Sequence, residues 1–193
     1  FVLARARQDD MPVAVWRLPG TGETHMILSE NSKKLEAGEF LEELDPGFMM
    51  APFDKSAGRY FLPADRFFTF RDGQLQASDG PEAEHSLRWL SEQLPSSSVE
   101  IKPFLSLPLQ GPAVPEAGRE AFLNIVKEGI KQIEAGTFEK IVPSRTRTIP
   151  LPRNFDVVAA FQKLCRSYPE ALISFASIPG VGSWLGASPE VLV

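Results

Sequence analysis

Lys140 is the residue of this sequence whose surroundings most need a chemical explanation. It lies in the stretch 138–149, which follows a long helical pattern and a glycine. If this stretch is a strand, side chains alternate between its faces, so the lysine lies beside Phe138, Val142 and Ser144 and has no carboxylate near it. It is then either a surface residue whose alkyl stem covers apolar groups, or a residue in a desolvated cleft, where its pKa falls and it acts as a base.

The opposite face of the same stretch carries the other charges. Glu139, Arg145 and Arg147 share this face, and the two arginines are candidate partners for the carboxylate. The charge pattern therefore leaves Lys140 without a counter-ion on its own strand.

A candidate acid, Glu190, lies in the stretch 183–193. In one interpretation Ser188 is a helix N-cap, Pro189 is the first helical residue, and the carboxylate is favoured by the helix dipole. In the other, the apolar residues 191–193 continue a strand and Glu190 is presented for chemistry. The nearby Gly186 either permits close approach of backbone or ligand or marks a strand bulge.

Together the two stretches resemble the paired signatures of the chorismate-utilising enzymes. The signatures are Lys-Ile-Val-Pro-Ser-Arg at 140–145 and Gly-Ala-Ser-Pro-Glu-Val-Leu at 186–192. The separation of Lys140 and Glu190 along the chain also resembles that between the general base and general acid of isochorismate synthases. The resemblance is specific over residues 119–193, whereas residues 1–118 resemble the family's variable N-terminal half only loosely.

This resemblance implies a reaction with two opposed groups. Isochorismate synthases add water to C2 of chorismate and expel the C4 hydroxyl, which requires a base on one side of the ring and an acid on the other. By resemblance Lys140 is the base, Glu190 is the acid, and Gly186 and Ala187 contact the substrate. The lysine must be neutral and the glutamic acid protonated, so both need desolvation or charged neighbours.

The identity of residue 140 bears on which relative the chain resembles most. Anthranilate synthases, which use ammonia, typically have Gln at the position that Lys140 occupies here, so lysine favours water addition. Salicylate synthases, which make isochorismate and then eliminate pyruvate, have the same lysine and remain an alternative. Two further alternatives are an aminodeoxychorismate-type synthase and a catalytically inert domain that keeps the fold. An isochorismate synthase would supply menaquinone or a catechol siderophore, and the sequence does not separate the two.

The resemblance also implies Mg²⁺, which holds the ring carboxylate of chorismate through carboxylate ligands expected beyond residue 193. We therefore expect no metal site in this chain. Phe1 in place of Met and an end at Val193 within a strand-like run indicate a piece of a longer polypeptide. We expect this piece to bind chorismate weakly and to be inactive without the rest of its polypeptide. The full-length protein is expected to be a monomer, whereas an unpaired strand edge would favour self-association of the piece.

Composition excludes several other classes of protein. The 193 residues are 43% hydrophobic and 23% charged, with a formal net charge of −5, and no Lys/Arg-rich run occurs. Binding to nucleic acid or to an anionic membrane therefore has no electrostatic support. No apolar run reaches the roughly 18 residues of a membrane span, and a cytoplasmic protein is expected. Cys165, the single cysteine, fits a reducing compartment and is expected to be a small core residue.

The positions of apolar residues, glycines and prolines predict an α+β fold, an antiparallel sheet with flanking helices that forms a truncated part of the chorismate-utilising fold. Helices are predicted over 81–94, over 116–135, and from a cap at Asn154 or Asp156 to about 168. Hairpins are predicted over 13–28, over 66–77 with Asp-Gly at the bend, and over 171–186, with a buried strand at 48–53. The predicted organisation is an N-terminal α+β region over 1–94, a Pro-rich connection over 95–118, and the first part of the catalytic region over 119–193.

Overall fold

The structure is a computed structural model in which residues 2–36, 39, 41–52, 58–76, 81–93, 118–152 and 155–189 are described. The chain divides into two compact units. One unit comprises residues 1–107 and 154–193, and the other comprises residues 108–153. Each unit is described here by itself.

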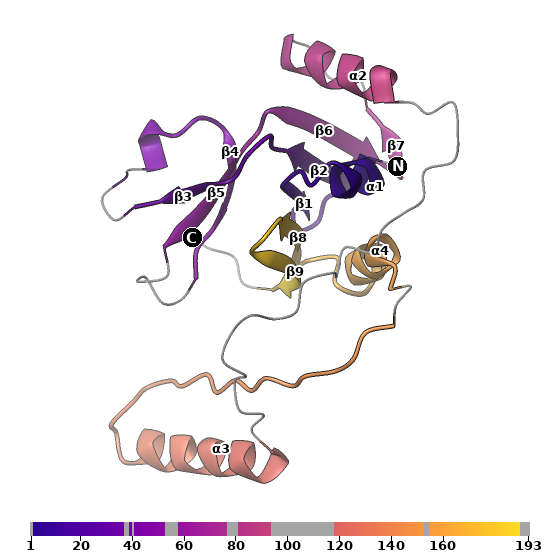
Figure 1. Cartoon of the computed structure of the whole chain (residues 1–193). Helices are drawn as coiled ribbons and strands as arrows, with labels where there is room; N and C mark the ends of the chain where they lie inside the picture. The colour runs from indigo at the N-terminus through magenta and orange to yellow at the C-terminus, as the bar shows by residue number, and fades with distance from the viewer. Residues whose placement is uncertain are drawn as a thin grey trace. The chain divides into compact units, whose positions relative to one another are not determined.

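A six-stranded antiparallel sheet is the centre of the first unit (Figure 1). Its strand order is β7-β6-β2-β1-β8-β9. The strands are β1 (Val13–Arg17), β2 (Glu23–Leu28), β6 (Arg66–Arg71), β7 (Gln74–Leu75), β8 (Leu172–Ile178) and β9 (Gly182–Ser188). Strand β1 pairs with β2 on one side and with β8 on the other, so residues far apart in the sequence share one sheet.

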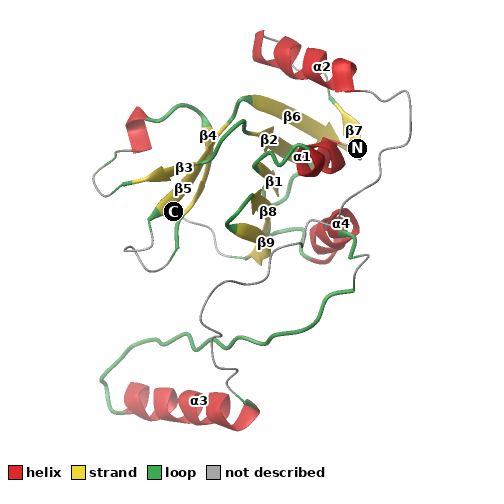
Figure 2. Cartoon of the chain, viewed as in Figure 1, coloured by secondary structure: helices red, strands yellow, loops and turns green. Residues whose placement is uncertain are grey.

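A second, three-stranded antiparallel sheet has the order β3-β5-β4. Its strands are β3 (Lys33–Leu35), β4 (Gly47–Met50) and β5 (Arg59–Pro63), and a short 3₁₀ turn, η1 (Leu41–Glu43), lies between β3 and β4 in the sequence. Figure 2 distinguishes these strands from the helices by colour. The helices are α1 (Val2–Gln8), α2 (Pro81–Gln93), α3 (Arg119–Glu134) and α4 (Val157–Ser167).

Alternation along β1 places apolar side chains on both faces of the large sheet. Val13 and Val15 belong to a core with α1 and α4, whereas Ala14 belongs to a core with Leu62 of the small sheet. The two-residue period of a strand explains this division. The large sheet is therefore covered by helices on one face and by the small sheet on the other, as expected for a strand with an uninterrupted apolar run.

The three predicted hairpins and the three predicted helices are present. The bend between β6 and β7 is formed by Asp72 (φ 52°) and Gly73 (φ 76°), the left-handed pair that a two-residue hairpin requires. Helix α4 begins after Asp156, whose carboxylate accepts a hydrogen bond from the Ala159 amide at 3.0 Å. This aspartate is therefore the cap, one of the two candidates that the sequence provided.

Four features differ from the sequence-based expectations. Helix α1, with Ala6 fully buried, was not predicted. The apolar run at 48–53 forms β4 only as far as Met50, and its side chains are half-buried instead of buried. One side of that strand remains open, since β4 pairs with β5 alone among the described strands. The short strands β3 and β5 lie in regions that the sequence analysis did not assign to strands.

The fourth difference concerns the stretch 138–149, predicted to be a strand. The described residues from 138 to 152 contain no strand or helix. A strand needs hydrogen bonds to a neighbouring backbone, and no described strand pairs with this segment. Pro143 and Pro150 also lack the N–H groups that a ladder uses.

The grouping of residues also departs from the predicted ranges. The sequence analysis separated 1–94 from 119–193, but β1 and β8 pair from Val13↔Ser177 to Arg17↔Ile173. Strands of both ranges thus form one sheet, while 118–152 belong to the other unit. Of the proposed connection 95–118, only residue 118 lies among the described residues.

Within the described residues, no helix has the length and apolar character that crossing a membrane would require.

Candidate functional site

Helix α3 and the segment that follows it position Lys140. A Cβ atom added at Gly129 would lie 3.0 Å from Cγ2 of Ile141, so glycine gives this side chain room against the helix. Further along, the guanidinium carbon of Arg145 lies 5.6 Å from the centroid of the Phe122 ring. The segment therefore runs back along α3, as Figure 1 also shows.

These two contacts define the faces of the extended segment. Ile141 and Arg145 have odd numbers and contact α3, and the half-buried Pro143 lies between them. In an extended chain the even-numbered residues then point away from the helix. Lys140 thus shares the outer face with Val142 and Ser144, and Arg145 lies on the opposite face, as the sequence pattern predicts.

The expected charge partners on the inner face are not observed. Among the described residues, no ion pair joins Glu139 to Arg145 or Arg147. Arg145 instead lies over an aromatic ring, an arrangement that is favourable for a guanidinium group.

Lys140 itself is exposed. Its neighbours on the outer face are exposed as well, and Val142 retains 73% of its accessible surface. A desolvated cleft around the lysine is therefore not formed by residues 118–152 alone. The segment presents the amine and does not enclose it.

The candidate substrate contacts Gly186 and Ala187 lie near the end of β9. They pair with Ser174 and Ile173 of β8, in an unbroken register from Leu172↔Ser188 to Ile178↔Gly182. The unbroken register excludes a β-bulge at Gly186. Both residues are exposed on a strand that, within the described residues, is at the edge of the sheet, and a Cβ at Gly186 would meet no atom within 4 Å. Of the two explanations for Gly186, the one left is that it permits close approach of backbone or ligand.

The predicted acid, Glu190, lies outside the described residues. It follows Pro189 directly in the sequence, two positions after the end of β9. Lys140 belongs to one unit and the strand that precedes Glu190 belongs to the other. Of the predicted site residues, Gly186 and Ala187 therefore lie together on β9, whereas Lys140 belongs to the other unit.

Metal ligands were not expected in this chain. No group of three or more His, Cys, Asp or Glu side chains that could hold a metal ion occurs in the described part of the structure.

Cys165 lies on α4 and is half-buried against the core that α1 and α4 form with the large sheet. Burial raises the pKa of its thiol above the ordinary value, and the charges of Arg17 and Arg166 oppose that change. The thiol therefore stays protonated at neutral pH. This finding agrees with the predicted role as a small core residue.

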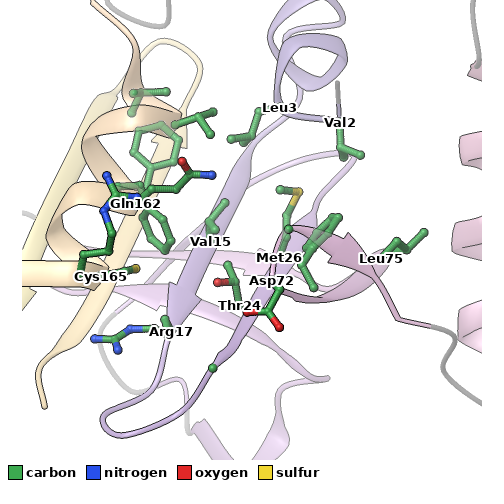
Figure 3. Close-up of a pocket in the computed structure, with 18 of the residues that line it drawn as sticks. Val2, Leu3, Val15, Arg17, Thr24, Met26, Asp72, Leu75, Gln162 and Cys165 are labelled. Atoms are coloured by element: carbon green, nitrogen blue, oxygen red, sulfur yellow. The ribbon is translucent and has the colours of Figure 1, made fainter. Parts of the chain in front are cut away.

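The sequence analysis did not identify a cavity of about 730 Å³ on the helix-covered face of the large sheet (Figure 3). Arg17 lies at one end of it and is buried. A signal for this arginine was present, because residues 13, 15 and 17 share one face of a strand whose other members on that face are apolar.

Comparison with known proteins assigns the family. The family model for chorismate binding enzymes matches residues 35–193, most of the chain. The chain belongs to the chorismate-binding enzyme family. Searches of curated proteins and of solved structures gave no match.

The family match covers more of the chain than the sequence-based resemblance did. The resemblance was recognised over residues 119–193, but the family model extends back to Leu35, at the end of β3. Most of the N-terminal region, including the small sheet from β4 onward, is therefore part of the family's fold. The mixed helices and antiparallel sheets agree with the predicted α+β class.

Proposed function

We propose that this protein is an isochorismate synthase, an isomerase that converts chorismate to isochorismate. Membership of the chorismate-binding enzyme family supports a chorismate-utilising synthase in general. The observation that carries the finer proposal is the lysine at position 140, in the motif where the ammonia-using relatives that it resembles have Gln.

In the proposed reaction Lys140 is the general base. Its amine takes a proton from water as the water oxygen forms a bond to C2 of the ring. The ring double bonds shift, the bond from C4 to its hydroxyl breaks, and Glu190 donates the proton with which that hydroxyl leaves as water. One water enters and one leaves, so atoms and electrons balance without a redox partner.

The geometry around Lys140 supports this role in one respect. The amine lies on the face of its segment that turns away from α3, beside Val142 and Ser144, and no ion pair with a described carboxylate holds it. A lysine without an ion pair becomes a base once a closing surface removes water from it.

We further propose Mg²⁺ dependence, on the family resemblance alone. The described residues include no group of three or more His, Cys, Asp or Glu side chains that could hold the ion. When bound, the ion would neutralise the ring carboxylate of chorismate.

The test is product analysis with the natural full-length protein that carries these residues. Chorismate and Mg²⁺ are supplied, and isochorismate and salicylate are separated by chromatography. The wild-type protein is expected to form isochorismate and no salicylate. Lys140→Ala is expected to lower the rate by roughly 10²–10⁴-fold, the contribution of a general base. The matched control is Lys131→Ala, an exposed lysine of α3.

Other products would identify the alternatives. Salicylate from the wild-type protein would assign it to the salicylate synthases, and a product that requires ammonia would assign it to the anthranilate or aminodeoxychorismate branch. Absence of any chorismate turnover in a folded, Mg²⁺-supplied wild-type protein would favour the inert domain. Full activity in Lys140→Ala would refute the role of the lysine.

A further inference from the structure

The cavity on the helix-covered face of the large sheet has the size and lining of a small-molecule site. Its volume of about 730 Å³ lies within the range of roughly 300–1,000 Å³ that is usual for ligand pockets. Helices α1 and α4, strands β1, β2 and β8, and the β6–β7 hairpin provide the lining, and no residue of 118–152 takes part. Its apolar lining includes Val15, Met26 and Phe175 of the sheet strands, Phe70 of the β6–β7 hairpin and Phe161 of α4.

Arg17 gives this cavity an unusual electrostatic feature. It is only 7% exposed, and its Nη2 atom donates hydrogen bonds to the carbonyl oxygens of Tyr168 at 2.7 Å and Ala171 at 2.9 Å. Its Nε atom is buried and has no hydrogen-bond partner in the described part of the chain. None of the ion pairs among the described residues includes Arg17. A buried cation that has neither a counter-ion nor a full set of acceptors costs free energy.

The other polar groups of the cavity add to the positive charge. Arg166, in the last turn of α4, is a second guanidinium, and Asp72 of the β6–β7 bend is the one carboxylate among the lining residues. Thr21, Thr24 and Gln162 supply uncharged hydrogen-bonding groups. Figure 3 shows Arg17 on the side of α4 that carries Cys165 and shows Asp72 beside Thr24. The α4 end of the cavity therefore favours an anion.

We propose that this cavity binds a small amphipathic monocarboxylate, at a site separate from the one that contains Lys140. The carboxylate lies between Arg17 and Arg166 and accepts the hydrogen bond that the buried Nε atom of Arg17 now lacks. Bonds of this kind between a guanidinium and a carboxylate are among the strong ones in proteins. The hydrocarbon body packs against the apolar lining, where Phe161 and Phe175 supply aromatic contact.

The experiment compares two ligands of nearly equal shape by titration calorimetry of the full-length protein. The carboxylate is 3-phenylpropionate, and its neutral counterpart is 3-phenylpropionamide. Because a hydrogen bond to a charged group contributes more than a neutral one, the carboxylate is expected to bind roughly tenfold or more tightly. Equal affinity for the two ligands would overturn the proposal. It would also be overturned if neither ligand saturated the protein at millimolar concentration.

Variants locate the binding. Arg17→Gln and Arg166→Gln are each expected to weaken binding of 3-phenylpropionate, by roughly tenfold for the buried arginine and by about threefold for the exposed one. The matched control is Arg88→Gln, an exposed arginine of α2 outside the cavity, which leaves the affinity unchanged. If Arg17→Gln does not fold, Thr24→Asp tests the same point, because a second carboxylate in the cavity repels the ligand. Unchanged affinity in both Arg166→Gln and Thr24→Asp would refute the site.

The lysine variant separates this proposal from the proposed enzyme activity. Lys140→Ala is expected to bind 3-phenylpropionate with wild-type affinity, since no residue of its segment lines the cavity. Loss of binding in Lys140→Ala would place the ligand at the proposed active site and overturn the separate site. A failure of isochorismate formation would leave the binding result intact.

Discussion

The two units of this protein differ in how completely they bury their own apolar side chains. In the unit of the large sheet, Ile27, Leu28, Leu62 and Ile173 are almost completely inaccessible to solvent. In residues 118–152, apolar side chains remain exposed on α3 and on the segment that follows it. They are Leu123, Ile125, Ile130, Ile133, Phe138, Ile141, Val142, Ile149 and Leu151.

This difference indicates where stability and chemistry reside. The large sheet is covered on both faces and can hold its own shape, since burial of apolar surface is the main favourable contribution to folding. The segment with Lys140 contacts only its own helix among the described residues of its unit. The residue proposed as the catalytic base is thus carried by the part of the chain that is least stabilised by its own core.

The sharpest test of this comparison is a pair of isoleucine truncations. Ile173→Ala, in the fully buried core of β8, is expected to lower the free energy of unfolding by about 2–5 kcal/mol. Ile130→Ala, at a side chain of α3 that is 51% exposed, is expected to change it by less than about 0.5 kcal/mol. Urea denaturation followed by circular dichroism measures both. A similar loss in the two variants would mean that the apolar face of α3 is buried in solution.

A second test moves the lysine without touching the sheet. Gly129→Leu places a side chain where Ile141 packs on α3, so the segment with Lys140 must shift. If the proposed function is right, isochorismate formation falls about tenfold to a hundredfold, because small displacements of catalytic groups are costly. The urea midpoint of the large sheet is expected to stay constant. Asn124→Leu, at an exposed position of α3, is the control and is expected to keep full activity.

A third test uses the different N-termini of two helices. Asp156→Ala removes the carboxylate that caps α4 and is expected to cost about 1 kcal/mol of stability, measured by thermal denaturation. Helix α3 has Gly118 as its N-cap residue, which provides no side-chain hydrogen bond. Gly118→Asp is therefore expected to raise helix content slightly and to leave the unfolding of the sheet unchanged. An equal response of the sheet to both substitutions would contradict the separation of the two units.

The smallest expected effect is the pH dependence from Cys165. Because burial raises the pKa of this thiol in the folded protein, folding favours its protonated form, and that contribution to stability is present below the pH at which an ordinary thiol ionises. It is lost as the pH rises through the higher pKa of the folded state. The rate of alkylation by iodoacetamide, measured against pH, should have a higher midpoint in the native protein than in urea. Coincident midpoints would show that the thiol is solvated.

Local sequence determined most of the elements. The Asp72-Gly73 bend, the apolar alternation of β1 and the apolar spacing of the longer helices act within a few residues, so their signals survive without tertiary context. Helix α1 was missed because its seven residues carry short apolar side chains at positions 4 and 6 that resemble a strand pattern. Its helical state depends on packing against the sheet.

The sequence by itself determined the family signatures, the face on which Lys140 lies and the opposite placement of Arg145, because a two-residue period needs only an extended chain. Only the tertiary structure decided which backbones pair. It joined β1 to β8 across most of the chain, left 138–152 without a partner among the described strands, and buried Arg17 beside a cavity. The physical reason is that a ladder hydrogen bond or a desolvated charge depends on a neighbour distant in sequence, which no local pattern specifies.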